Sequence, residues 1–215
     1  MESYKNNGMS LYNRDCMEGM AKYPDNYFDL AIVDPPYGID AGKMGLGKGK
    51  GTESREWTSK NWDNLPPKKE YFSEVFRVSK NQIIWGANYF EDMKPTPCWV
   101  IWDKIQEFSG ASFEMAWASF KSPAKAFRMA RCEAYVGINK IHPTQKPVKL
   151  YSWLLQNYSS PEHKILDTHL GSASHAIAWH YFNKGGEFVG YELDSEYFEK
   201  SIARIEQETA QISMF

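Results

Sequence analysis

The chain has 215 residues, of which 42% are hydrophobic and 24% are charged, as in ordinary globular domains rather than in disordered or membrane-embedded proteins. Its formal net charge of −2 argues against a protein that coats nucleic acid with a basic surface, although a local basic groove remains compatible with it. The three cysteines lie far apart and the five histidines follow no zinc-ligand spacing, so we expect reduced thiols and no metal.

Targeting and membrane signals are missing from the sequence. No basic stretch followed by an apolar core stands near the N-terminus, and no apolar run approaches the length of a bilayer span. We therefore expect a cytoplasmic protein with no membrane partner. The length suits a single domain with modest insertions.

The first half of the chain alternates short apolar runs with helical patterns. Strands are predicted at 9–12 and 28–33, because each is a short apolar run bounded by polar residues. Helices are predicted at 16–23 and 68–78, the second from its apolar face. Further strands are expected at 82–85, 98–102 and 113–120, with the last two forming a hairpin.

The second half continues this alternation. Helix 148–158 follows Pro147, which is favourable at a helix start, and strand 164–166 comes next. Helix 175–182, strand 188–191 and helix 195–207 complete the chain. This order predicts an α/β fold with a mixed, mostly parallel sheet and helices on both faces.

Four predicted strands are followed by an acidic residue. These residues are Asp15, Asp34, Asp167 and Glu192. The carboxyl ends of parallel strands meet at one edge of a sheet, and ligands of such sheets bind there. We therefore expect the four acids to line one binding edge.

The segment from Asp167 to Glu192 has the pattern of a nucleotide pocket. Gly171 lets the backbone approach a ligand closely after the strand, and a helix follows. Glu192 stands 21 residues after Gly171, at the end of the next strand, which is the usual place for an acid that binds ribose hydroxyls. The turn lacks the Gly-x-Gly-x-x-Gly pattern, so a dinucleotide is disfavoured. A plain tight turn with a surface carboxylate fits the same residues.

The segment Asp34-Pro35-Pro36-Tyr37 also has residues suited to catalysis. Its prolines fix a rigid, extended backbone after a buried strand. The Asp34 carboxylate and the proline carbonyls are hydrogen-bond acceptors that can hold an exocyclic amine and localise its lone pair. Tyr37 offers a flat face for a base removed from a duplex. By itself the segment also fits a strand-ending turn with a buried tyrosine.

Several motifs together resemble one known family, the amino-methyltransferases of DNA. The catalytic motif precedes the cofactor motif, which is similar to the order in the β group of that family. The similarity covers roughly residues 9–40 and 80–207. It implies a Rossmann-like methyltransferase fold with S-adenosylmethionine as cofactor. The matching segments are Asn13-Arg14-Asp15-Cys16, Asp34-Pro35-Pro36-Tyr37, His142-Pro143-Thr144-Gln145-Lys146-Pro147 and Asp167-Thr168-His169-Leu170-Gly171-Ser172.

The resemblance assigns catalysis to Asp34, Pro35, Pro36 and Tyr37, with the Asp34 carboxylate and the Pro35 carbonyl on the target amine. It also implies that Asp15 contacts the adenine of the cofactor and that Glu192 binds its ribose. Thr144 and Lys146 would lie near the methionine carboxylate. The complete implied cofactor set is Asp15, Cys16, Asp34, His142, Pro143, Thr144, Lys146, Asp167, His169, Gly171, Ser172 and Glu192.

The cofactor loop departs from the family pattern Asp-Pro-Phe-x-Gly-Ser-Gly at three positions. Thr168 and His169 replace the Pro-Phe pair, and Ala173 replaces the last glycine. We expect a neutral His169, because a charged imidazole would be unfavourable beside a sulfonium cation. His169 fits equally a flat ring against the cofactor and a packed core histidine.

An aspartate rather than a serine at position 34 favours N6 of adenine over N4 of cytosine, by resemblance to the family. Methylation at N4 of cytosine is the nearest alternative. An RNA or protein-glutamine methyltransferase and a non-catalytic nucleic-acid-binding module are further alternatives. Methylation at C5 of cytosine is set aside, because no cysteine stands in a Pro-Cys pair.

Double-stranded DNA is the expected partner, and a homodimer is plausible for so compact a chain. We expect target recognition within residues 40–65 and 104–140, as small insertions in one domain spanning 1–215. A basic stretch can equally be a solvated face. The candidate phosphate contacts are Lys43, Lys48, Lys50, Arg55, Lys60, Lys121, Lys125, Arg128 and Arg131, and the candidate packing aromatics are Trp57, Trp62, Phe127 and Tyr135.

Overall fold

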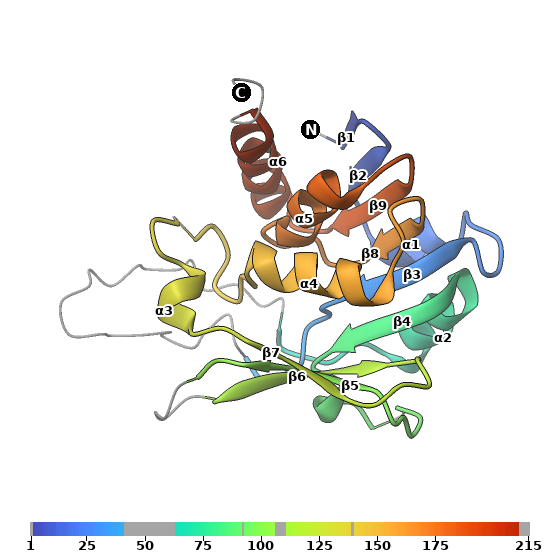
Figure 1. The fold of residues 1–215 in the computed structure, drawn as a ribbon. Helices are drawn as coiled ribbons and strands as arrows, with labels where there is room; N and C mark the ends of the chain where they lie inside the picture. The colour runs from blue at the N-terminus through green and yellow to red at the C-terminus, as the bar shows by residue number, and fades with distance from the viewer. Residues whose placement is uncertain (1, 41–62, 92, 106–110, 139, 211–215) are drawn as a thin grey trace.

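The computed structural model describes residues 2–40, 63–91, 93–105, 111–138 and 140–210 (Figure 1). Most of the first expected recognition region lies outside the described residues, including Lys43, Lys48, Lys50, Arg55, Trp57, Lys60 and Trp62. The described part forms an α/β fold around one mixed, mostly parallel sheet. In order across the sheet the strands are β1 (Ser3–Asn6), β2 (Met9–Asn13), β9 (Glu187–Glu192), β8 (Lys164–Asp167), β3 (Phe28–Val33), β4 (Ser79–Trp85), β6 (Phe113–Ala118), β5 (Trp99–Asp103) and β7 (Lys125–Arg128).

The centre of the sheet is parallel and buried. Strands β2, β9, β8, β3 and β4 run parallel to one another. Strand β3 is almost wholly buried, as its uninterrupted apolar run predicts for a strand covered on both faces. The expected hairpin is confirmed, because β5 pairs antiparallel with β6, and β6 pairs antiparallel with β4.

Helices cover both faces of this sheet, as predicted (Figure 1). One face carries α4 (Val148–Tyr158), α5 (Ser174–Phe182) and α6 (Ser195–Ala210), which share a core with the sheet. The other face carries α1 (Cys16–Met20) and α2 (Lys69–Val78). Two short segments, the 3₁₀ helix η1 (Ala87–Tyr89) and α3 (Arg131–Ala134), lie beyond β4 and β7.

The sequence pattern missed two strands, and burial explains both omissions. Strand β1 is mostly exposed at the edge of the sheet, and β7 is mostly exposed at the opposite edge. Edge strands held mainly by backbone hydrogen bonds need no apolar alternation, so the hydrophobic pattern does not reveal them. The predicted strand 82–85 also starts earlier, at Ser79, where its first residues pair with β3.

Candidate active site

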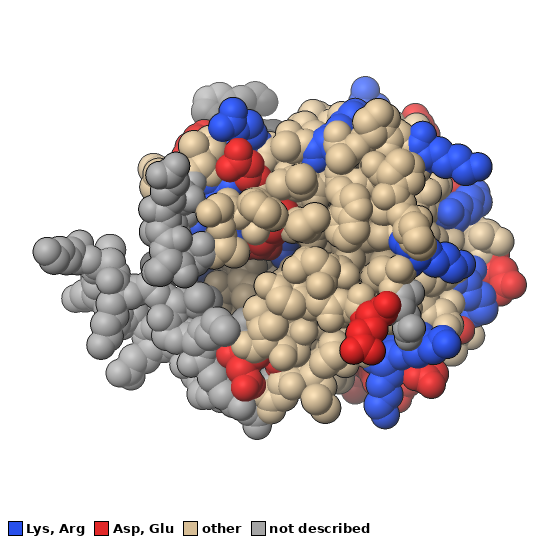
Figure 2. All heavy atoms as spheres, turned by 90° about the horizontal axis from the view of Figure 1, so that it is seen from below, with Lys and Arg blue, Asp and Glu red and all other residues tan. Residues whose placement is uncertain are grey.

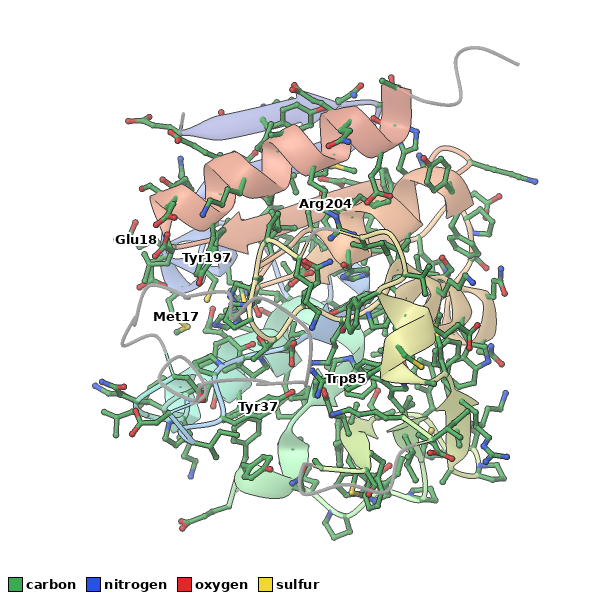
Figure 3. The ribbon with its side chains drawn as sticks, turned by 90° about the vertical axis from the view of Figure 1, so that its left-hand side faces the viewer. Met17, Glu18, Tyr37, Trp85, Tyr197 and Arg204 are labelled. Atoms are coloured by element: carbon green, nitrogen blue, oxygen red, sulfur yellow. The ribbon has the colours of Figure 1, made fainter. Side chains whose placement is uncertain are left out.

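The four strands followed by acids lie side by side, in the order β2, β9, β8 and β3, and all point to the same edge. The expected convergence of Asp15, Glu192, Asp167 and Asp34 at this edge is therefore what the structure has. Figure 3 views the molecule from the side toward which these strands point, with Tyr197 above Tyr37 and Trp85. Helix α6 contributes Tyr197, and β4 contributes Trp85.

A cavity of about 480 Å³ opens at this edge, and we call it the first cavity. Its volume is in the range of pockets that enclose a small organic ligand. Of the residues expected to bind a cofactor, Pro143 and Asp167 are not on its wall. The wall includes Arg14, Asp15, Cys16, Asp34, Pro36, His142, Thr144, Lys146, Thr168, His169, Gly171, Ser172, Glu192 and Tyr197.

Glu192 is held against the loop after β8. Its carboxylate accepts hydrogen bonds from the backbone N–H of Gly171 at 2.8 Å and of Asp194 at 2.9 Å. Burial raises the pKa of Glu192 to about 7, although these two bonds oppose the shift. Gly171 has a φ of +53°, which glycine adopts without strain. Loop and acid are thus joined directly, as their spacing in the sequence suggests.

Ala173 occupies the position where the family pattern has its last glycine. It keeps a left-handed backbone, with φ of +60°, at the start of α5. Such a conformation costs a non-glycine residue roughly 1–2 kcal/mol. The substitution therefore preserves the shape of the turn at a cost in strain.

Asp15 and Cys16 follow β2, the strand next to β9, and also line the first cavity. Asp15 caps α1 by accepting a hydrogen bond from the backbone N–H of Met17 at 2.8 Å. Burial, followed by the charge of Asp15, raises the pKa of the Cys16 thiol to about 12. A thiol in that state is not a nucleophile at neutral pH, so Cys16 can only contribute to the cavity wall.

Asp167 acts within the loop rather than on the cavity wall. Its carboxylate accepts a hydrogen bond from the backbone N–H of His169 at 3.0 Å and lies 3.0 Å from Nδ1 of buried His175. His175 in turn stacks on Tyr151, with ring centroids 4.8 Å apart. This chain of contacts fixes the loop against α4, so the structure gives Asp167 a supporting position.

His169 combines the two alternatives that the sequence left open. Its ring lies on the wall of the first cavity, and it also packs edge-on against Tyr71 at 5.5 Å between ring centroids. Nδ1 lies 2.9 Å from the hydroxyl of Thr168, which also contacts Tyr71. Burial lowers the pKa of His169 to about 4, so the imidazole is neutral at physiological pH, as expected.

Residues 142–146 form the wall between the first cavity and its neighbour. Nδ1 of His142 lies 3.1 Å from the hydroxyl of Thr144, and the His142 ring packs on Tyr197 at 4.4 Å between centroids. Pro143 lies on the far side of this wall, in the second cavity. Gln145, to which the family resemblance assigned no role, is buried and lines both cavities.

The second cavity has a volume of about 320 Å³ and is lined by Pro35, Tyr37 and residues from β5 and β6. Tyr37 stacks on Tyr89 with centroids 5.3 Å apart and planes 14° apart. Such aromatic walls suit a flat, planar ligand. The residues common to both cavities are Asp34, Pro36, Thr144, Gln145 and Lys146.

Asp34 lies at the junction of the two cavities. Its Oδ1 accepts a hydrogen bond from the Tyr37 hydroxyl at 2.6 Å, and its Oδ2 lies 2.5 Å from Nζ of Lys146. Burial raises the pKa of Asp34, and Lys146 opposes that shift. The backbone N–H groups of Tyr37 and Gly38 donate to Asp63, which holds the turn after β3 in place.

An ion chain that no sequence motif predicted extends from Lys146 into the second cavity. Glu114 on β6 lies 3.2 Å from Nζ of Lys146 through one oxygen and 2.8 Å from Nζ of Lys104 through the other. Burial alone would raise the pKa of Glu114, but Lys146 and Lys104 lower it to about 2. A lone glutamate within the apolar run of residues 113–118 was the one signal that could have revealed it.

The residues predicted to contact DNA lie in different parts of the structure. Arg131 and Tyr135 line the second cavity, and Tyr135 also donates a hydrogen bond to the backbone of Gln145. Phe127 instead packs on Trp153 beside the core. Lys125 bonds Asn157 and Arg128 pairs with Asp103, both at exposed positions. Figure 2 shows mostly uncharged side chains on the face seen from below, with many Lys and Arg side chains toward its margins.

Neither a metal centre nor a membrane span is present in the part of the chain that the structure describes. No group of three or more His, Cys, Asp or Glu side chains there is arranged to hold a metal ion. No helix in the same residues has both the length and the apolar character required to cross a bilayer.

Known proteins resemble the chain in sequence and in structure. A family model described as "DNA methylase" matches residues 103–204. YubD of Escherichia coli K12, whose name assigns it to the methylases, is 25% identical over 201 residues, covering 89% of this chain and 87% of YubD. The type II methyltransferase M2.MboI of Moraxella bovis is 22% identical, covering 93% of this chain and 88% of its own.

Solved structures give the same fold. The PvuII DNA methyltransferase, titled cytosine-N4-specific, superposes with a TM-score of 0.59 at 13% identity and covers 96% of this chain and 92% of its own. The M1.HpyAVI–SAM complex superposes with a TM-score of 0.57 at 18% identity, covering 92% of this chain and 98% of its own. The motifs assembled on this fold, the family-model match over residues 103–204 and these relatives together support a DNA amino-methyltransferase family for the chain.

Proposed function

We propose that this chain transfers a methyl group from S-adenosylmethionine to N6 of adenine in double-stranded DNA. The observation that carries the proposal is the position of Asp34, whose carboxylate is shared by the two cavities. One cavity has an acid and a glycine loop suited to a nucleoside, and the other has aromatic walls suited to a base. An acceptor at their junction can hold an amine toward a bound methyl donor.

S-adenosylmethionine fits the first cavity by the chemistry of the wall. The Glu192 carboxylate, fixed by Gly171 and Asp194, is placed to accept hydrogen bonds from ribose hydroxyls. Asp15 offers an acceptor for the adenine amine, and His142 and Thr144 border the remaining space. The neutral state of His169 avoids repulsion of a sulfonium cation.

When bound, the cofactor supplies a methyl carbon whose bond to sulfur breaks, with its electron pair going to sulfur, as the amine lone pair forms the new N–C bond. The residues of the chain align and hold the amine. Asp34 and the Pro35 carbonyl accept its hydrogens, which favours a tetrahedral nitrogen with a localised lone pair. The nitrogen then loses one proton, and Asp34, whose pKa is raised by burial, is suited to accept it. Tyr37 supplies the stacking face for the flipped base.

The choice of adenine is supported by Asp34, which stands where the family resemblance associates aspartate with adenine and serine with cytosine. Methylation at N4 of cytosine uses the same geometry and is the second candidate, and one structural neighbour carries that specificity in its title. We further propose that residues 104–140 take part in target recognition, because Arg131 and Tyr135 line the second cavity. A homodimer would let two compact chains embrace one duplex.

Modification-sensitive sequencing of DNA from cells that express the chain tests this proposal. We expect N6-methyladenine within a defined sequence, and none with the Asp34→Ala variant. Digestion of the same DNA to nucleosides identifies the modified base independently. N4-methylcytosine as the sole product would replace adenine by cytosine, and an absence of any modified base would refute the activity.

A further inference from the structure

We propose that Lys146 recognises the target base by donating a hydrogen bond to the ring nitrogen next to the methylated amine, and that Glu114 is the positioning residue that holds Lys146 there. The inference rests on the proposed function and adds to it a means of base selection. It departs from the resemblance, which implies that Lys146 lies near the methionine carboxylate of the cofactor.

The contacts of Lys146 support a role in the second cavity. Its ammonium group lies 2.5 Å from Asp34 and 3.2 Å from Glu114, and donates to the Tyr37 hydroxyl at 3.2 Å. These three acceptors occupy the three N–H groups of the ammonium, so a bound base has to replace one of them, and the Tyr37 hydroxyl at 3.2 Å is the uncharged acceptor that the ring nitrogen would replace. All three acceptors line the second cavity, and Glu114 and Tyr37 do not line the first. The side chain is only 3% exposed, so its direction is fixed by these partners.

The chemistry of the bases explains what such a pair selects. In adenine and in cytosine, the exocyclic amine stands next to an unprotonated ring nitrogen, which is an acceptor. In guanine the neighbour of the amine on the Watson–Crick edge is N1, which carries a hydrogen, whereas the acceptor N3 lies on the opposite, sugar edge; thymine has no exocyclic amine. An acceptor beside a donor, as in Asp34 and Lys146, therefore complements the Watson–Crick edge of adenine or cytosine and opposes that of guanine.

Glu114 makes this arrangement compatible with methyl transfer. A cation beside the base would oppose the positive charge that develops on the amine. The buried chain of Asp34, Lys146, Glu114 and Lys104 contains two anions and two cations, so the base faces no net charge from it. Glu114 also gives Lys146 a second anionic partner, which keeps the ammonium from resting on Asp34 alone. Strand β6 holds Glu114 rigidly, since Glu114 pairs with Trp102 of β5.

Base analogues in the identified recognition duplex test the hydrogen bond directly. Replacing the target adenine by 1-deazaadenine keeps the amine and removes the ring acceptor; 3-deazacytosine serves if the base proves to be cytosine. We expect kcat/KM of the wild type to fall about 10- to 100-fold on the analogue. In Lys146→Met, activity should be low on both duplexes, with less than about a threefold difference between them.

The controls separate this proposal from the parent activity. 7-Deazaadenine keeps the ring acceptor and should be methylated like adenine. Lys80→Met removes an ammonium that pairs with Asp29 at the other end of β4. This variant should keep the wild-type ratio of kcat/KM between the adenine and the 1-deazaadenine duplexes. Equal rates of wild type on adenine and 1-deazaadenine overturn the inference but leave the proposed function standing. No methylation of the normal duplex overturns both.

Variants of Glu114 test its positioning role. Glu114→Gln should lower kcat at least about tenfold and reduce the discrimination against the deaza analogue, while calorimetry with S-adenosylmethionine alone gives a Kd within about twofold of wild type. Glu114→Asp should restore part of the discrimination. If Glu114→Gln keeps the wild-type ratio of kcat/KM between the normal and the deaza duplexes, the positioning role of Glu114 is overturned. If that variant fails to fold, the ratio of kcat/KM between the two duplexes in Lys146→Met still decides the main inference.

Discussion

Gly86 lies so close to the ring of Tyr37 that a Cβ atom on this glycine would stand 2.1 Å from Cε1 of the tyrosine. Gly86 also has a φ of +69°, at the end of β4, where a side chain would be strained. The backbone of a neighbouring strand thus sets the position of the tyrosine that faces the second cavity. Neither residue signals this relationship in the sequence, because 49 positions separate them.

Gly86→Ala should therefore displace Tyr37 and lower the rate of DNA methylation by about 10- to 100-fold, because a misplaced stacking face misaligns the amine. The Kd for S-adenosylmethionine should remain close to wild type, because Gly86 does not line the first cavity. Steady-state kinetics and calorimetry measure the two effects. Gly137→Ala is the matched control, with a φ of +68° and no atom of the described residues within 4 Å of the added Cβ. An equal loss of activity in both variants would contradict the specific role of Gly86.

Asp34→Asn should reduce kcat by about 10²–10³-fold, because the amide keeps the shape of the carboxylate but loses its charge and one acceptor. Asp34→Ala should abolish methylation. Cofactor affinity should change little in either variant, since Asp34 forms only one part of the first cavity wall. Methyl incorporation into DNA and calorimetry provide the measurements. Wild-type turnover in Asp34→Ala would show that this carboxylate does not hold the amine.

Thermal denaturation must accompany those assays, because Asp34 is a partner of buried Lys146. Removing one partner of a buried pair commonly costs about 3–5 kcal/mol. We expect a smaller loss for Asp34→Ala, because Glu114 and Tyr37 still contact the ammonium. A melting temperature close to wild type would show that any loss of activity is chemical rather than structural.

Glu192 should make cofactor binding dependent on pH near neutrality. Its pKa of about 7 means that the carboxylate gains its charge as the pH rises through 7. An ionised carboxylate accepts ribose hydroxyls better, so affinity for S-adenosylmethionine should increase roughly tenfold between pH 6 and 8. Glu192→Gln should bind about 10- to 100-fold more weakly at pH 8 and lose this dependence. Calorimetry across that range checks both points, and an unchanged pH profile in the variant would contradict the assignment.

The same titration affects stability in the opposite direction. The folded chain holds the Glu192 proton up to about pH 7, whereas the unfolded chain releases it near the ordinary value of 4.5. The folded state therefore binds more protons in this window, and the Glu192 contribution to the free energy of unfolding falls as pH rises from 4.5 to 7. Urea denaturation of wild type and Glu192→Gln at several pH values isolates that contribution. A contribution that grew with pH would mean that the carboxyl pKa is lowered instead.

His169→Phe should retain cofactor binding within about threefold, because the imidazole is neutral and serves mainly as a partly buried ring. His169→Ala should weaken binding and lower stability by about 2–4 kcal/mol, since it leaves a gap beside Tyr71. Calorimetry and urea denaturation separate the two variants. A collapse of binding in His169→Phe alone would show that the contact between Nδ1 and Thr168 is essential.

The central strands and most helices could be predicted because their side chains are buried in regular patterns. Strand β3 and helix α4 have the bounds expected from hydrophobic periodicity and from Pro147. The exposed edge strands β1 and β7 lack that pattern and were missed. The convergence of four acids followed from topology alone, because parallel neighbouring strands must end at one edge.

What the sequence by itself determined was therefore the α/β order of elements, the acids at the strand ends and the family resemblance carried by local motifs. Only the tertiary structure decided that Lys146 contacts Asp34 and Glu114, and that Gly86 packs on Tyr37. Periodicity reports which residues are buried, but it carries no information about which buried groups meet across strands. Those contacts depend on strand order and register. In this chain, strand order and register separate the cavity with the glycine loop from the cavity with the aromatic walls.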